Sequence, residues 1–298
     1  MLRYQNQLFF LPVILSVVAL ASIFHWGLRP GIDLAGGSLL EVKYTVARPA
    51  VDKIRTVVAT LNYGEVRVQP SGTQNVMLRE RTLSPQEKSK LMDTLSTLGA
   101  TEEVQFNSVG PTIGAELMSK AWWAIGLVVL AIILFVAFAF RHVSKPVSSW
   151  KYGVVVIVTL LHDILIPIGL FAYLGATRGA EVDVLFIVAL LTILGISVND
   201  TIVVFDRIRE NLRLNEEKRL KEAFNSVVAH STMQTLARSI NTSVTVVIML
   251  VALFYFGPTA TKDFSLTLII GMIAGTYSSI FLASPLLVLI ERYQKKRA

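Results

Sequence analysis

Six runs of roughly 20 apolar residues constrain this chain most, because a helix of that length crosses the hydrocarbon core of a bilayer. Hydrophobic residues make up 53% of the 298 residues, charged residues only 16%, and the mean hydropathy is +0.58. Soluble globular domains rarely have this composition. The sequence therefore predicts a membrane α-helical protein with six spans, at about Leu8–Trp26, Ala121–Phe140, Gly153–Leu174, Val184–Phe205, Ile240–Phe256 and Phe264–Ile290.

The distribution of basic residues predicts the orientation of these spans. In a six-span arrangement the short loops on one side hold only Arg178 and Lys262. Cytoplasmic loops carry an excess of Lys and Arg, so both termini are predicted to be cytoplasmic, and the net charge of +7 indicates topology and not nucleic-acid binding. The basic residues on the predicted cytoplasmic side are Arg3, Arg141, Lys145, Lys151, those between Arg207 and Arg238, Arg292, Lys295, Lys296 and Arg297.

The chain contains no cysteine, which excludes disulfides, thiolate metal sites and a cysteine nucleophile. No other metal-ligand spacing, phosphate-binding loop or Ser-His-Asp arrangement is evident. We therefore expect no cofactor and no enzymatic activity.

The first apolar run has two interpretations. Ala19-Leu20-Ala21 resembles the small-residue site at which a signal peptide is cleaved. The run is nevertheless longer than a typical signal sequence and continues to Trp26, whose ring suits a membrane interface. We favour retention of this run as an anchor over cleavage.

Three regions follow from this pattern: residues 1–26 as the first span, 27–120 as a periplasmic domain, and 121–298 as five further spans. Within 27–120 the hydrophobic period indicates the order β-α-β-β-α-β, which predicts a small ferredoxin-like α+β domain. A capping box, Ser84-Pro85-Gln86-Glu87, opens its second helix. The predicted strands are Gly37–Thr45, Glu65–Gln69, Asn75–Arg79 and Glu102–Ser108, and the helices are Pro49–Leu61 and Ser84–Leu98.

Residues 206–237 are predicted to form a cytoplasmic amphipathic loop. Within it, 207–229 spaces apolar residues among charges at helical intervals. We favour a helix lying on the inner membrane surface over a dedicated partner-binding site.

Asp200 lies inside a predicted span, where a carboxylate costs several kcal/mol unless it is paired, protonated or hydrated. At 1.5 Å per residue, it is about 25 Å below the outer edge of its span at Asp183. Arg238 is about 28 Å below the outer edge of the next span at Gly257, whereas Asp163 is only about 18 Å below Gly175. The sequence thus predicts an Asp200–Arg238 ion pair and places Asp163 in a separate layer.

Such a pair could take part in proton movement, because a small change in the position of the arginine would switch the protonation of the carboxylate. Asn199, Asn241 and Thr242 supply polar groups next to the pair. The alternative is a static salt bridge that locks two helices together. Asp163 follows His162, and this pair is interpreted either as a proton relay or as structural.

Gly271, Gly275 and the nearby Ser279 form a small-residue face on the last span, which predicts close helix packing.

Several motifs together resemble one family, the SecF subunits of the bacterial Sec export machinery, and the resemblance spans nearly the whole chain. The most specific are the long segments around Asp200 and Gly275. The motifs are Gly31–Gly37, Val109–Leu117, Leu161-His162-Asp163, Gly195–Glu210, Arg238–Ser243 and Gly275–Pro285.

The resemblance implies a six-span RND-type helix bundle in the bacterial inner membrane, forming one half of a pseudo-symmetric pair with SecD. It further implies use of the proton motive force to complete translocation of preproteins that emerge from the SecYEG channel. Asp200 and Arg238 would then lie on the proton pathway, with Asn241 and Thr242 as weaker neighbours.

Three other functions would account for parts of this pattern. A scaffold without proton coupling would also contain a structural Asp200–Arg238 pair, and an RND-type small-molecule exporter would share the bundle but usually has two large external domains. An intramembrane aspartyl protease would need Asp163 and Asp200 at one site, which the depth estimates oppose.

Overall fold

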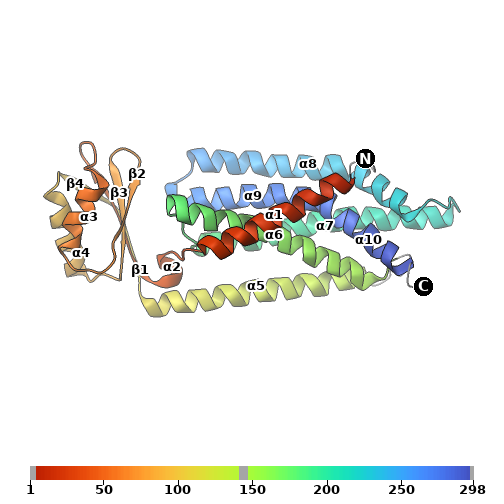
Figure 1. Ribbon diagram of the computed structural model, residues 1–298, viewed down its shortest axis with the longest axis horizontal. Coiled ribbons are helices and arrows are strands. Elements are labelled where there is room, and N and C mark those ends of the chain that lie inside the picture. Colours follow the sequence, from red (N-terminus) through yellow and green to blue (C-terminus); the bar gives the residue numbers. More distant parts are fainter. Residues whose placement is uncertain (1–4, 141–146, 296–298) are drawn as a thin grey trace. The chain divides into compact units, whose positions relative to one another are not determined.

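The computed structural model describes residues 5–140 and 147–295 (Figure 1). Arg3, Arg141, Lys145, Lys296 and Arg297, which enter the predicted topology, lie outside this part of the chain. Residues 29–123 and 181–184 form one compact unit, an α+β domain, and the rest of the described chain forms a helical unit. The elements in order are α1 (Gln5–Trp26), α2 (Ile32–Ala35), β1 (Gly37–Tyr44), α3 (Val51–Ala59), β2 (Arg67–Ser71), β3 (Asn75–Glu80), α4 (Pro85–Ser96), β4 (Thr101–Val109), α5 (Pro111–Ala139), α6 (Ser149–Arg178), α7 (Val184–Glu217), α8 (Phe224–Phe256), η1 (Thr259–Thr261), α9 (Lys262–Ser278), η2 (Ser279–Ala283) and α10 (Ser284–Lys295).

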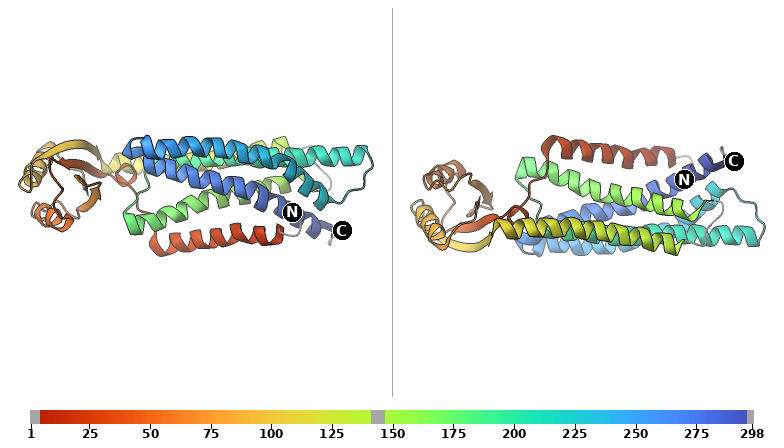
Figure 2. Two further views of the ribbon diagram at one scale, coloured as in Figure 1. Left: turned by 90° about the horizontal axis from the view of Figure 1, so that it is seen from above. Right: turned by 90° about the horizontal axis from the view of Figure 1, so that it is seen from below.

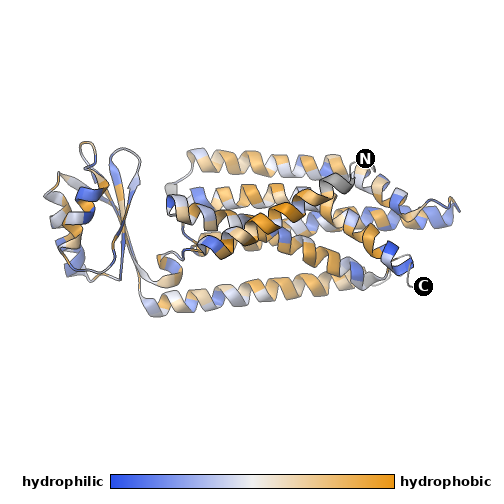
Figure 3. Ribbon diagram, viewed as in Figure 1, coloured by the Kyte–Doolittle hydropathy of each residue, from blue (hydrophilic) through white to orange (hydrophobic). Residues whose placement is uncertain are grey.

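Six helical segments of the described chain are long and apolar enough to cross a membrane, as predicted. Apolar residues dominate them (Figure 3), and the sixth is the continuous run of α9, η2 and α10. The segments are Phe9–Trp26, Pro111–Ala139, Trp150–Arg178, Val184–Glu217, Phe224–Phe256 and Lys262–Lys295. The chain therefore contains a multi-span helical bundle.

The region 206–237 differs from the prediction, because it contains no separate surface helix. α7 continues to Glu217 and α8 begins at Phe224, so this region consists of the two ends of a long helical hairpin (Figure 2). The Asn211 amide donates to the Ser231 hydroxyl at 2.8 Å across the hairpin. The apolar face that the periodicity detected is buried against the bundle core, through residues such as Ile208 and Val228.

Close contacts between aromatic rings and between backbones hold the helical unit together. Phe140 and Tyr152 stack with their centroids 5.4 Å apart, and Phe205 meets both rings edge-on. α1 approaches α6 so closely that a Cβ on Gly169 would lie 2.5 Å from the Cα of Ala19. The small residues at 19–21 that resemble a cleavage site thus lie within a helix that packs on α6.

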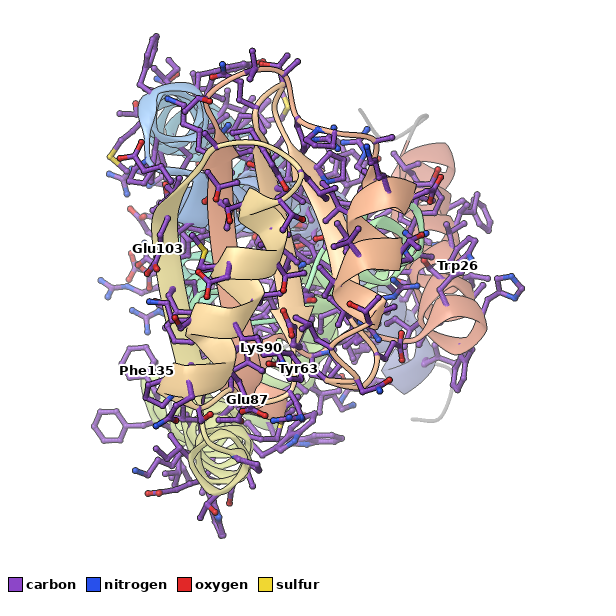
Figure 4. All side chains as sticks on the ribbon, turned by 90° about the vertical axis from the view of Figure 1, so that its left-hand side faces the viewer. Trp26, Tyr63, Glu87, Lys90, Glu103 and Phe135 are labelled. Atoms are coloured by element: carbon purple, nitrogen blue, oxygen red, sulfur yellow. The ribbon has the colours of Figure 1, made fainter. Side chains whose placement is uncertain are left out.

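The α+β domain has a four-stranded antiparallel sheet in the order β2-β3-β1-β4, which is the ferredoxin-like arrangement that the sequence predicted. Figure 4 views the domain from the side on which α3 and α4 cover the sheet. The predicted capping box opens α4: the Glu87 backbone N–H donates to the Ser84 hydroxyl, and the Ser84 backbone N–H donates to the Glu87 carboxylate. The core between the helices and the sheet contains Leu40, Val42, Ile54, Val58, Val76, Leu78, Leu91 and Leu95.

The two motifs that flank the domain meet backbone to backbone. Gly36 has a φ of +77°, and a Cβ on Gly114, in the first turn of α5, would lie 2.6 Å from the Gly36 nitrogen. A Cβ on Gly37, with a φ of +136°, would lie 2.7 Å from the Glu80 carbonyl oxygen. Only glycine satisfies both the positive φ and the close approach.

Glu80 is a buried acid at the end of β3. Only 7% of the residue is exposed, and both carboxylate oxygens are buried without a hydrogen-bond partner among the described residues. Burial raises the pKa of Glu80 to about 7; the Arg81 charge opposes this rise, and the Glu87 charge adds to it. The folded domain therefore binds this proton more tightly than the unfolded chain does.

Replacing Glu80 with Gln is expected to change how stability depends on pH. In the wild type, stability should be greatest below the ordinary glutamate pKa of 4.5 and fall as pH rises toward 7 and above, by about 2 kcal/mol. Thermal unfolding of the full chain in detergent at pH 5 and pH 8 measures this loss, which E80Q should largely remove. The control E65Q changes a carboxylate that is 83% exposed and should leave the pH dependence as in the wild type. Identical pH dependence in E80Q and the wild type would contradict the assignment.

Candidate functional site

Hydroxyl, imidazole and carboxyl groups gather inside the helical unit, where a membrane-spanning bundle is otherwise apolar. Asp163 on α6 is fully buried. Its carboxylate contacts Nδ1 of His162 at 2.9 Å and accepts a hydrogen bond from the Ser197 hydroxyl of α7. Adjacent helical residues usually point apart, but here His162 and Asp163 bond directly to each other.

Asp200 is the second carboxylate of this region and is partly buried. The Ser239 hydroxyl of α8 donates to its Oδ1 at 2.5 Å. Its Oδ2 is buried without a hydrogen-bond partner in the part of the chain that the structure describes. On the following residue, the Thr201 hydroxyl bonds to that of Ser279 at 2.9 Å, so α7 contacts both α8 and η2 at this level.

The predicted ion pair between Asp200 and Arg238 is not formed. Arg238 is exposed and has no ion pair within residues 5–140 and 147–295, and its neighbour Ser239 contacts the carboxylate instead. Counting residues predicts depth along a helix, but consecutive residues also point about 100° apart. The depth estimate therefore found the correct turn of α8 and not the side chain that faces α7.

The predicted separation of Asp163 from Asp200 is also wrong. α6 ends at Arg178 and not at Gly175, the edge used for the depth estimate, which puts Asp163 about 22 Å from the end of its helix. Asp200 lies about 24 Å from the start of α7 at Val184. The two carboxylates are thus nearly level, and Ser197, which donates to Asp163, is one helical turn from Asp200.

The remaining predicted pathway residues do not join this buried cluster. Asn199, Asn241 and Thr242 are exposed on α7 and α8. Together with Arg238 they place polar groups on the outside of two membrane-spanning helices, where lipid alone would solvate them poorly.

The small-residue face of the last span packs on α7 at intervals of four residues. A Cβ on Gly271 would lie 2.2 Å from Ile193, and a Cβ on Gly275 would lie 3.1 Å from the Ser197 hydroxyl and 3.6 Å from Asp163 Oδ2. One turn further, Ser279 bonds to Thr201. The glycines therefore allow α9 to approach the polar cluster closely.

Sequence reasoning missed the π-helical turn η2, which starts at Ser279. A π turn inside an α-helix is uncommon and often marks a functional position. Pro285 follows this turn and lacks the backbone N–H that a regular helix would use, which was the available signal in the sequence. Ser239 and Ser197 were also missed as direct ligands of the carboxylates, because serine is common in helix packing.

The arrangement can hold and exchange protons. Each carboxylate has its own hydroxyl donor, and hydroxyl and imidazole groups both donate and accept hydrogen bonds. Asp163 and Asp200 do not share a hydrogen bond within the described chain, as an aspartyl protease dyad would require. The geometry favours proton binding over peptide hydrolysis.

Family models match most of the chain. Residues 89–293 match the model described as "Protein export membrane protein SecD/SecF, C-terminal", and residues 21–47 match the "SecD/SecF GG Motif". Among solved structures, the crystal structure of SecDF, a translocon-associated membrane protein from Thermus thermophilus, superposes with a TM-score of 0.83 at 29% identity. It covers 96% of this chain, which spans 38% of the SecDF chain. A SecDF structure in a super-membrane-facing form has a TM-score of 0.69 at 29% identity, covering 99% of this chain and 39% of that one.

Curated relatives match over nearly their full length. The protein translocase subunit SecF of Thermobaculum terrenum is 42% identical over 300 residues, covering 96% of this chain and 92% of the relative. That of Pseudomonas aeruginosa is 34% identical over 289 residues, covering 95% and 89%. The chain therefore belongs to the SecF family of protein translocase subunits, within the SecD/SecF membrane proteins of protein export.

Proposed function

We propose that this chain is an accessory subunit of the Sec protein-export machinery and that it couples proton movement at Asp200 to preprotein translocation. The observation that carries this proposal is the carboxylate of Asp200, which has one oxygen bonded to Ser239 and the other buried without a partner among the described residues. A membrane carboxylate without a cation is costly when ionised. In this arrangement Asp200 therefore carries a proton.

Proton release requires a second arrangement, and Arg238 can supply it. Arg238 precedes Ser239 on α8, so a rotation of that helix by about 100° replaces the serine with the arginine beside Asp200. The arginine stabilises the ionised carboxylate, and the proton leaves toward the cytoplasm. Alternation between the two partners converts proton movement into helix movement.

The exposed polar groups of α7 and α8 support a partner within the membrane. Arg238, Asn199 and Asn241 lie on outer helix surfaces at membrane depth, where a second protein would cover them better than lipid. SecDF of the superposed structure is a single chain of which this chain corresponds to 38%. A separate SecD subunit supplies the remainder, and the complex acts with SecYEG on the emerging preprotein.

The bacterial inner membrane is the proposed location, with both termini in the cytoplasm and the α+β domain in the periplasm. This orientation puts the basic α7–α8 hairpin on the cytoplasmic side, as the excess of Lys and Arg in cytoplasmic loops favours. Protons are the only coupling ion that the mechanism needs.

A charge-swapped variant distinguishes coupling from scaffolding. Asp200→Arg combined with Arg238→Asp, reconstituted with a SecD-like partner in proteoliposomes, should assemble but lose proton flux and proton-dependent export, because the carboxylate no longer faces Ser239 and its buried surroundings. The readouts are dye-detected proton flux and protease-protected preprotein. Full export by the swapped complex would instead support a scaffold in which opposite charges at positions 200 and 238 only hold α7 and α8 together.

A further inference from the structure

The end of the α6–α7 connection and the first residue of α7 belong to the α+β domain. Residues 181–184 form part of its compact unit, although residues 181–183 lie between two membrane-spanning helices in the sequence. The Val182 N–H donates to the Arg29 carbonyl at 2.8 Å, and the Gly31 N–H donates to the Val182 carbonyl at 2.8 Å. This pair of bonds makes a short parallel bridge next to the glycine motif.

An ion pair fixes the same connection to the sheet. Arg79 on β3 meets Glu181 with Nε and Oε2 3.0 Å apart, and these side chains are only 19% and 11% exposed. A Cβ on Gly31 would lie 3.3 Å from this carboxylate, so the glycine motif leaves room for it. Glu181 is thus enclosed by the start of the domain on one side and by β3 on the other.

The charges around Glu181 come from several segments of the domain. Burial raises the pKa of Glu181, as does the charge of Asp183, whereas Arg79, Arg67 and Arg29 oppose the rise. The charges of three arginines from separate segments therefore act on Glu181. A buried charge surrounded in this way is far more sensitive to loss of a partner than an exposed surface pair.

The connection is also short. Between the end of α6 at Arg178 and the start of α7 at Val184 there are five residues, and an extended chain spans at most about 3.6 Å per residue. α6 carries Asp163, and α7 carries Asp200. α7 begins within the bonded segment, and α6 is joined to it through Gly179 and Ala180 alone, so at most two residues separate either helix from that segment.

We propose that residues 181–184 are the latch through which movement of α6 and α7 is transmitted to the α+β domain, with Arg79 and Glu181 as its positioning residues. The inference rests on the proposed coupling function and adds the path from the membrane carboxylates to the domain. It requires both bonds of the latch: the backbone bridge at Val182 and the Arg79–Glu181 ion pair.

Charge reversal tests the latch in the full chain with a SecD-like partner in proteoliposomes. R79E and E181R should each speed hydrogen exchange at Gly31 and Val182 by about tenfold or more. Each should also lower export by about tenfold while proton flux persists, because helix movement no longer drives the domain. The double reversal R79E/E181R should restore slow exchange and export. If a charge-reversed protein does not accumulate in cells, E181Q is tested in its place, because it removes the charge with little change in shape.

The matched control is D52R, which reverses the acid of an exposed pair with Arg55 on α3, with side chains 90% and 56% exposed. It should change neither exchange nor export. Unchanged exchange in the single reversals, or normal export despite fast exchange, would overturn the latch. A failure of the proposed coupling function would give a different result, because D200N would leave export unaltered. The hydrogen-exchange measurement would still show whether the ion pair holds the connection.

Discussion

Replacing Asp200 with Asn is expected to reduce proton-dependent preprotein export by about tenfold or more while the complex with SecD still assembles. Asparagine keeps the shape of the side chain and can still accept the hydrogen bond from Ser239. It cannot ionise, so it neither takes up nor releases a proton. Export into proteoliposomes with and without an imposed proton gradient measures the effect, and the gradient-dependent part should disappear.

A second aspartate on the same helix provides the control. Asp206 lies at the polar end of α7, its side chain is 59% exposed, and it pairs with Arg209 at 3.0 Å. Exposed pairs of this kind contribute less than about 1 kcal/mol, so D206N should export as the wild type does. Equal export by D200N and D206N would show that no proton-coupled step passes through Asp200.

Gly169→Val is expected to produce the largest loss of stability. A Cβ at this position would lie 2.5 Å from the Cα and Cβ of Ala19 and 2.9 Å from its carbonyl oxygen. These are mainly backbone atoms, which a rotamer change cannot move, so α1 must separate from α6 and lose the hydrogen bond from the Ser22 hydroxyl to the Gly169 carbonyl at 2.7 Å. We expect destabilisation of about 3 kcal/mol, measured as a lower midpoint of thermal unfolding in detergent.

Gly126→Val is the matched control for this substitution. Gly126 lies within α5, and apart from the neighbouring backbone of its own helix no described atom is within 4 Å of a Cβ placed there. The change in helix propensity is the same at both positions and small, because valine is an adequate helix former. A similar loss of stability in the two variants would mean that propensity, and not the α1–α6 contact, determines the effect.

Local signals predicted most of the fold. Span length follows directly from the thickness of the bilayer. The α+β domain could be predicted because the hydrophobic alternation, the capping residues and the turn residues agree along residues 37–109. Its second helix begins with the predicted Ser84–Glu87 box. The α7–α8 hairpin was mispredicted because an apolar stripe indicates that a face is buried but does not identify the surface that buries it.

The site was less predictable because it depends on the direction in which each side chain points around its helix, and not only on the depth of the residue along the helix. Asp200 was identified from its cost in lipid alone. Its partner was misassigned by one residue, since Arg238 and Ser239 lie on the same turn and only tertiary packing decides which of them faces α7. The depth of Asp163 was underestimated because α6 ends at Arg178, three residues beyond Gly175, the edge used in the estimate, and the contact of Asp163 with Ser197 was missed for that reason.

The pairing of the first and last strands brings the two ends of residues 37–109 together. Gly37 at the start of β1 lies opposite Val109 at the end of β4, so the chain enters and leaves the domain at one place. An element with adjacent entry and exit can be enlarged, reduced or exchanged without rerouting the helices that precede and follow it. The close approach of Gly36 and Gly114 lies at this point, so a change in the length of the segment between β1 and β4 leaves that backbone contact in place.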